Sequence, residues 1–366
     1  MGKDINGELI RKSFYSTKSK TNAKRKAEEF RRQYELALLC GGEPIRPHKR
    51  FKDWAIQCLE LYKKPYVKAN TYCGTYLLPV NKRLIPYFGD KAVDEILPIQ
   101  VQGYINQISK ELAPETVKKD FTILAFIMKY AVENGLCASN PASHAIRLPK
   151  IERPDKHAYT QAEYDIAYQF AASHPLGLSI MTLMETGISR SELLGLRWED
   201  FDPEKAALHI RQGLVAYQNT SEKTWVMESE GLKNIYRRRD VPLVDPLLLE
   251  RLCSKPRKIV VGGQEVEPEY IFHSPEGQPY QPQNWNNRVY SRFTKELLAA
   301  HPELPKLSPH ELRHTRATLW LAQGVSPLMV AKLLGHTDLK MLAKIYDHTS
   351  IDTLRTAITA KKEEAG

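Results

Sequence analysis

Cysteine is scarce in this chain of 366 residues, and long apolar runs are missing from it. The cysteines are odd in number and scattered, and their spacing is not that of metal ligands, so we expect reduced thiols and no disulfide framework or zinc site. They are Cys40, Cys58, Cys73, Cys137 and Cys253. No apolar stretch reaches the roughly 18 residues of a membrane span, and no signal-peptide pattern is present. The sequence therefore predicts a cytoplasmic protein that does not associate with a membrane.

Positive charge, by contrast, is abundant and unevenly distributed. The formal net charge is +10, and residues 11–32 hold nine basic residues against Glu28 and Glu29. The basic residues are Arg11, Lys12, Lys18, Lys20, Lys24, Arg25, Lys26, Arg31 and Arg32. Such a stretch can neutralise DNA phosphates and release counterions, which gives salt-sensitive and largely sequence-independent affinity. Taken alone, however, it is more typical of a solvated surface or a disordered tail.

The chain is long enough for two or three domains, each with a core of its own. In its first part we expect a short strand at 9–16, a basic helix at 21–40, and then a linker rich in Gly and Pro. Residues 51–150 have the pattern of helices. The clearest helix follows Pro114 and ends near Gly135, because apolar residues recur in it at helical spacing.

A proline-containing stretch at 140–159 separates this part from the rest, and we place a domain boundary there. Thr160 and Glu163 form a capping-box pattern, which predicts a helix through about residue 173. From residue 285 onward the pattern is again helical. Between these helical parts, alternating apolar and polar residues predict three strands at 207–212, 224–229 and 237–244.

The last third of the chain carries the candidate chemistry. Residues 308–311 (Ser-Pro-His-Glu) are a capping box with proline at the first helical position, so a helix starts there. His310, Arg313 and His314 are spaced to share one face of this helix. The core-facing side is expected to carry Leu312, Thr315 and Leu319.

A second helix is expected to start at Pro327 and to end at Gly335, which leaves His336 in a turn and Tyr346 on the next helix. These residue types suit metal-free attack on a phosphodiester. The transition state gathers negative charge on the non-bridging oxygens, and the planar fork of arginine can bind two of them. A tyrosine hydroxyl titrates near ~10, so it needs a base or cationic surroundings, and histidine can relay its proton.

These segments resemble the C-terminal boxes of the tyrosine recombinases, the phage integrase family. The motifs are HELRHTRAT from His310, LLGH ending at His336 and YDH from Tyr346. Upstream, residues 185–202 (ETGISRSELLGLRWEDFD) resemble the family's first box. Residues 230–243 (EGLKNIYRRRDVPL) resemble its lysine hairpin followed by the motif Arg-x-Val-Pro-Leu. Four ordered blocks make a specific match, whereas any one alone is weak. The resemblance implies a site-specific DNA recombinase of the integrase or excisionase type.

The resemblance also implies the architecture and the partners. A short basic segment at 1–46, similar to the end of an arm-binding domain, would precede an all-α core-binding domain at 48–150. A mixed α/β catalytic domain at 157–350, mainly helical with a small antiparallel sheet, would be followed by a tail at 351–366. The two central domains would clamp duplex DNA, with four protomers on two paired recombination sites in a bacterial host. An accessory directionality factor or DNA-bending protein would be a further partner.

In the implied mechanism, Tyr346 attacks the scissile phosphate and becomes joined to its 3′ side, which frees a 5′ hydroxyl. Arg190 and Arg313 would hold the phosphate oxygens. A 5′ hydroxyl from the partner duplex then attacks the phosphotyrosine, so rejoining needs no ATP.

Three further residues have implied roles in proton transfer and binding. His310 would accept and donate the proton, and His336 would hydrogen-bond a phosphate oxygen. Lys233, in a loop between the second and third strands, would protonate the leaving oxygen, which requires its pKa to fall from the usual ~10.4. No metal or nucleotide cofactor is implied.

One position departs from the family's pattern. The first box usually runs Thr-Gly-x-Arg-x-x-Glu, but here Ser189 stands at the arginine position and Arg190 follows it, while Glu192 keeps its spacing. One residue on a regular helix is a rotation of about 100°. We assign the role to Arg190, whose long side chain can curl back. The alternatives are that Ser189 contacts the phosphate while another arginine supplies the charge, or that activity is impaired.

Two other functions explain part of the pattern. Residues 326–341 also resemble a helix-turn-helix, so a DNA-binding regulator with a disabled active site would account for the basic charge. A type IB topoisomerase-like enzyme would share the chemistry but act as a monomer without paired sites. Taken singly, each candidate residue is better explained as a surface, capping or ion-pairing residue, and only the joint pattern favours the recombinase.

Overall fold

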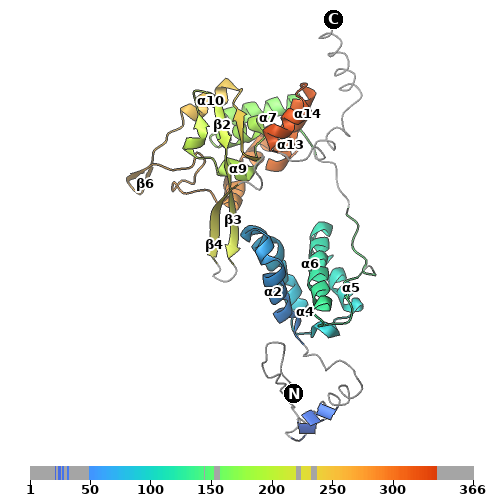
Figure 1. Cartoon of the computed structure of the whole chain (residues 1–366). Coiled ribbons are helices and arrows are strands. Elements are labelled where there is room, and N and C mark those ends of the chain that lie inside the picture. The colour runs from blue at the N-terminus through green and yellow to red at the C-terminus, as the bar shows by residue number, and fades with distance from the viewer. Residues whose placement is uncertain are drawn as a thin grey trace. The chain divides into compact units, whose positions relative to one another are not determined.

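A computed structural model describes residues 49–143, 145–151, 157–219, 224–231 and 237–335, together with individual residues between 21 and 32. The chain divides into two compact units, Met1–Ile151 and Glu152–Gly366, called here the N-terminal and C-terminal units (Figure 1). Several predictions concern residues outside the described ones: the strand at 9–16, the tail at 351–366, Lys233, His336 and Tyr346. No described helix is both long and apolar enough to cross a membrane.

The N-terminal unit is a helical bundle, which confirms the predicted all-α character of this part. Its described helices are α2 (Phe51–Tyr62), α3 (Ala69–Thr71), α4 (Ile85–Phe88), α5 (Pro98–Ile108) and α6 (Pro114–Glu133). The backbone stays helical from α3 to α4 through two π-helical stretches, Tyr72–Leu77 and Val80–Leu84. As predicted, α6 starts with Pro114 at its first turn, and Gly135 follows it with a positive φ of 68°.

A buried carboxylate links the helices of this bundle. Asp120 of α6 is fully buried and accepts hydrogen bonds from Arg83 at 2.5 and 2.7 Å. It also accepts one from the Tyr104 hydroxyl of α5 at 2.9 Å. A carboxylate taken out of water must be paired to stay charged, so these contacts fix the relative positions of the three segments. The surrounding core is apolar and includes Phe51 and Phe88.

The C-terminal unit is mainly helical with small antiparallel sheets, as the resemblance implied (Figure 1). Its helices are α7 (Gln161–Ser173), α8 (Gly177–Thr186), α9 (Arg190–Leu194), α10 (Pro246–Cys253), α11 (Pro282–Trp285), α12 (Ser291–Ala300), α13 (Pro309–Ala322) and α14 (Pro327–Leu334). Its strands are β1 (Phe201–Asp202), β2 (Ala207–Ile210), β3 (Gln212–Asn219), β4 (Thr224–Gly231), β5 (Arg239–Pro242), β6 (Ile259–Val261) and β7 (Gln264–Val266).

The strand prediction for this unit was incomplete. Strands β2, β4 and β5 lie within or over the three predicted ranges, but β1, β3, β6 and β7 were not expected. The longest of these is β3. Residues 214–217 of β3 are the contiguous run Leu-Val-Ala-Tyr, which lacks the alternation on which the prediction relied. β3 pairs with β4 as a hairpin, whereas β2 lies between β1 and β5 in a separate sheet. The chain therefore changes sheets at Arg211.

The predicted capping boxes are confirmed. Thr160 caps α7 with Glu163, and the Ser308 amide donates to the Glu311 carboxylate at 2.7 Å at the start of α13. Leu312, Thr315 and Leu319 of α13 are buried, as expected. α14 ends where predicted, at Gly335, which has a positive φ of 68°.

Candidate active site

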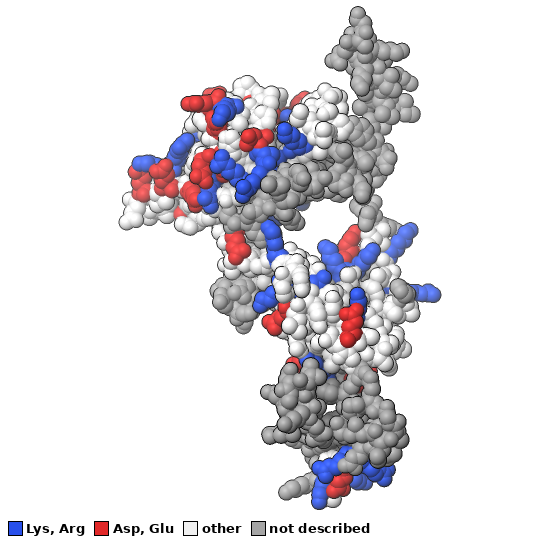
Figure 2. All heavy atoms as spheres, viewed as in Figure 1, with Lys and Arg blue, Asp and Glu red and all other residues white. Residues whose placement is uncertain are grey.

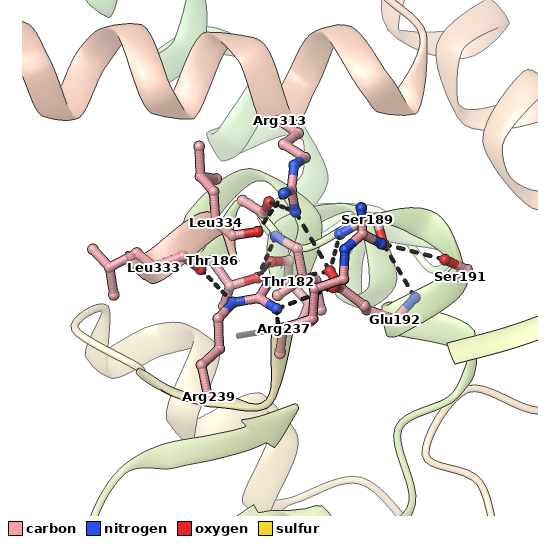
Figure 3. Close-up of polar contacts among 12 residues, drawn as sticks. Thr182, Thr186, Ser189, Ser191, Glu192, Arg237, Arg239, Arg313, Leu333 and Leu334 are labelled. Atoms are coloured by element: carbon pink, nitrogen blue, oxygen red, sulfur yellow. Dashed lines mark hydrogen bonds and ion pairs between the residues drawn. The ribbon is translucent and has the colours of Figure 1, made fainter. Parts of the chain in front are cut away.

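Arg313 lies at the centre of a buried polar group in the C-terminal unit. Only 6% of the residue is exposed, although it lies one turn after the exposed His310 on α13. Its Nη1 donates to the Gly187 carbonyl at 3.0 Å, and its Nη2 donates to the Leu334 carbonyl. Arg313 therefore joins α13 to the turn after α8 and to the end of α14 (Figure 3).

Glu192 of α9 binds a second buried arginine. Arg239 donates from Nη1 to Glu192 Oε1 at 3.0 Å and from Nη2 to Oε2 at 3.1 Å, and both side chains are almost fully buried. Arg313 Nη1 lies 3.4 Å from the same Oε2. Arg239 also donates from Nε to the Leu333 carbonyl at 2.5 Å and from Nη1 to the Arg237 carbonyl at 2.9 Å. Figure 3 shows Arg239 and Arg313 next to the Glu192 carboxylate, and the Leu333 and Leu334 carbonyls that these two arginines bind.

The group carries more positive than negative charge. Burial alone would raise the pKa of Glu192, but the hydrogen bonds from Arg239 and the charges of Arg239 and Arg313 hold it at about 2, so the carboxylate stays ionised. Burial lowers the pKa of Arg313 to about 10, against the attraction of Glu192, and the charges of Arg239 and Arg237 lower it further. Three guanidinium charges thus act around one carboxylate. A phosphate oxyanion placed here would meet oriented, partly desolvated donors.

The serine of the unusual first box is the N-cap of α9. Ser189 has an extended backbone (φ −77°, ψ 157°), and its amide donates to Glu192 Oε2 at 2.7 Å. In return, the Glu192 amide donates to the Ser189 hydroxyl at 3.4 Å. This is a capping box, the pattern Ser-x-x-Glu that also starts α13, and it could have been recognised in the sequence. Ser189 therefore has a clear structural role, and Arg190 is the first residue of the helix.

Arg190 does not join this polar group. It is half-buried and makes no side-chain hydrogen bond or ion pair with any residue that the structure describes. Burial lowers its pKa, and no charged group among the described residues adds to that effect. Its assignment to the phosphate therefore stays a prediction, as do those of His310 and Arg313. The structure brings Arg313 to the first box but does not describe the positions of Lys233, His336 and Tyr346.

A second buried pair holds the same turn from its other side. Arg316 of α13 donates from Nε to the Glu185 carbonyl at 2.9 Å and from Nη2 to the Glu185 carboxylate at 3.0 Å. Its guanidinium carbon also lies 4.8 Å from the centre of the Trp320 ring. Two arginines of α13 therefore pair with glutamates on either side of Gly187 in the sequence, Arg316 with Glu185 of α8 and Arg313 with Glu192 of α9. Burial raises the pKa of Glu185, against the lowering effect of Arg316.

The sequence interpretation gave neither Arg239 nor Glu192 a role in the site. A signal was present, since β5 alternates buried and exposed residues and its buried Val241 shares a face with Arg239. An arginine on the buried face of a strand must be paired, which calls for a buried carboxylate. Within the described ranges, no three His, Cys, Asp or Glu side chains gather as metal ligands would.

Comparison with known proteins identifies the family. A model of the phage integrase family matches residues 159–352, and a model of the phage integrase central domain matches residues 51–147. The chain is 28% identical over 367 residues to a "Tyrosine recombinase XerC-like" protein of Caldanaerobacter subterraneus subsp. tengcongensis, covering 95% of this chain and 90% of that one.

Two solved structures share the fold. The Tn1549 transposon integrase in complex with a circular intermediate DNA has a TM-score of 0.67 and 20% identity, covering 84% of this chain and 98% of that one. A lambda integrase tetramer bound to a Holliday junction has a TM-score of 0.58 and 19% identity, covering 94% and 90%.

Proposed function

Since this chain belongs to the phage integrase family and is a tyrosine-type site-specific recombinase, we propose that it cuts and rejoins duplex DNA through a 3′-phosphotyrosine bond to Tyr346. The observation that carries this proposal is the surplus of positive charge around Glu192, where Arg313 and Arg239 share one carboxylate. Buried charge of one sign is costly unless an ion of the other sign binds it. A DNA phosphate is that ion in the proposed reaction.

The proposed chemistry follows from the residue types. The Tyr346 hydroxyl attacks the scissile phosphorus, and its proton passes to His310. Arg313 and His336 stabilise the charge that develops on the non-bridging oxygens. Lys233 donates a proton to the departing 5′ oxygen, and the reverse attack by a 5′ hydroxyl restores the backbone. No metal or nucleotide takes part in these steps.

The scissile phosphate would also need a second cation. Arg190 is the candidate that the sequence offers, one residue after Ser189. Its side chain is half-buried and has no hydrogen bond or ion pair with a described residue.

The proposed partner is duplex DNA carrying paired recombination sites. Figure 2 shows lysine and arginine side chains on the visible face of the N-terminal unit, and basic residues outnumber acidic ones between residues 49 and 151. Such a surface can contact phosphates. The lambda integrase tetramer on a Holliday junction supports an assembly of four protomers on two sites. An accessory directionality factor or DNA-bending protein stays a prediction.

A suicide substrate tests the proposal. The substrate is a duplex from the DNA that flanks the coding region, nicked so that the short fragment bearing the freed 5′ hydroxyl diffuses away and rejoining stops. We expect the wild type to accumulate a covalent protein–DNA adduct and Tyr346→Phe to accumulate none, because the nucleophilic oxygen is missing. A wild type that binds this DNA but never forms an adduct would instead indicate the DNA-binding regulator, the alternative that Ser189 suggests.

A further inference from the structure

Ser189 stands where the family's first box has an arginine, so the site lacks one positive charge for the phosphate. Ser189 caps α9, so a serine there is explained structurally, but it brings no positive charge to the phosphate. Both oxygens of Glu192 are already bound by Arg239, and Arg313 and the Ser189 amide also contact Oε2. Arg239 is already bound to Glu192 through both Nη1 and Nη2. If two guanidinium groups are to bind the phosphate, the one besides Arg313 must therefore come from outside this set.

Arg237 is anchored beside this group by its backbone. It lies two residues before Arg239, whose Nη1 donates to the Arg237 carbonyl at 2.9 Å. Its Cα is 3.3 Å from the position that a Cβ on Gly335 would take, so it packs against the end of α14. The neighbouring Leu334 carbonyl accepts the hydrogen bond from Arg313. Two contacts thus hold the Arg237 backbone at the edge of the site.

The Arg237 side chain extends from this anchor toward the turn at Ser189 (Figure 3). It is half-buried, and among the described residues its guanidinium has neither a hydrogen bond nor an ion pair. Its charge is near enough to Arg313 to help lower the pKa of Arg313, whereas the charge of Arg190 has no such effect. Two guanidinium groups that approach each other without a carboxylate between them repel, unless an anion binds both.

We infer that Arg237 supplies the second guanidinium to the scissile phosphate, in place of the arginine that Ser189 replaces, and that Arg190 does not. The inference rests on the proposed recombinase function. Arginine suits the role because its planar fork can bind the phosphate through two parallel hydrogen bonds. Arg237 is then a catalytic residue, which lies two residues before the start of β5 and is positioned by Arg239.

The first test measures the rate of adduct formation on the nicked substrate. Removing one preorganised donor from a developing oxyanion costs about 10²- to 10³-fold in rate, and we expect that loss for Arg237→Ala. Arg237→Lys should recover part of it, because a point charge remains but the fork is lost. The matched control is Arg238→Ala, which removes an exposed arginine from the adjacent position. Urea unfolding of each variant monitors the fold.

The second test separates charge neutralisation from a structural role. A substrate whose scissile phosphate is replaced by a methylphosphonate lacks the negative charge that Arg237 would bind. On this substrate, the rate of adduct formation by Arg237→Ala should lie within about tenfold of the wild-type rate. A variant that merely distorts the site should instead lose the same factor in rate on both substrates. The inference would be overturned if Arg190→Ala lost rate on the phosphate substrate but not on the methylphosphonate, while Arg237→Ala lost no rate on either.

The third test does not depend on cleavage. In the Tyr346→Phe background, the slope of log Kd against log salt for the same duplex should fall by about 0.9 when Arg237 becomes alanine, because one phosphate contact is lost. An unchanged slope overturns the inference, whatever the activity. A reduced slope in a protein whose wild type never forms an adduct would uphold the phosphate contact and reject the proposed function.

Discussion

Glu192 connects the residues that surround the candidate phosphate site. Its two carboxylate oxygens accept hydrogen bonds from Arg239. One of them also pairs with Arg313 and accepts a hydrogen bond from the Ser189 amide. Removing one member of a buried ion pair leaves the other charged and unpaired, which typically costs about 3–5 kcal/mol of folding free energy. The carboxylate therefore stabilises the fold and, through it, the direction in which Arg313 points.

The first prediction concerns the acid stability that Glu192 provides. Its pKa is about 2 in the folded chain and 4.5 as the reference value, so the ionised form is favoured by folding. A carboxylate whose pKa is lowered by folding adds to the free energy of unfolding at pH values above its unfolded pKa. For Glu192 this contribution is about 3 kcal/mol above pH 4.5, and it is lost as the pH falls toward 2. Glu192→Gln should unfold more easily at neutral pH and lose this part of the pH dependence.

Urea unfolding of the full chain at a series of pH values checks this expectation. Glu204→Gln, which neutralises an exposed glutamate of the same unit, is the matched control and should retain the wild-type pH dependence. If the unfolding free energy of Glu192→Gln changed with pH as the wild type's does between pH 4.5 and 2, the buried network would not be the origin of this acid stability.

At the scale of the elements, local signals predicted the helix ends better than the strands. Thr160 and Ser308 marked the starts of α7 and α13, and Gly335 marked the end of α14, because capping depends on residues within one turn. β3 escaped prediction because its contiguous apolar run fits no period of two. The structural role of Ser189 was predictable in the same way as that of Ser308, because each serine stands three residues before a glutamate.

The second prediction concerns the end of α14. Gly335 has a positive φ of 68°, and a Cβ on it would lie 2.9 Å from Arg239 Nη1 and 3.3 Å from the Arg237 Cα. Gly335→Ala should therefore cost about 1–2 kcal/mol in backbone strain and a further ~1–3 kcal/mol in displaced neighbours. Because Arg237 and Arg239 would shift, the rate of adduct formation should fall by about 10- to 100-fold.

Gly324→Ala is a matched control for this substitution. Gly324 also has a positive φ, 87°, but nothing lies within 4 Å of a Cβ placed on it. The control should show the backbone cost in urea unfolding and retain the wild-type rate of adduct formation. Equal losses of stability and rate in the two variants would mean that the contact with the arginines has no effect.

At the scale of the whole molecule, each unit has its own core and at least one buried ion pair. Asp120 pairs with Arg83 in the N-terminal unit, and Glu192 pairs with Arg239 in the C-terminal unit. The motif blocks predicted the family, the mainly helical character and the position of Arg313 on α13. They could not predict that Arg313 is buried against Gly187 and Leu334, because those residues are far apart in the sequence and only packing brings them together.

Identifying the residue that becomes linked to DNA tests the central claim most directly. The covalent adduct from the nicked substrate is digested with nuclease and protease, and the peptide that retains a nucleotide is sequenced by mass spectrometry. We predict a single modified residue, Tyr346, joined to a 3′ phosphate. Attachment of the phosphate to any other side chain, or a wild type that yields no linked peptide on DNA that it binds, would contradict the account.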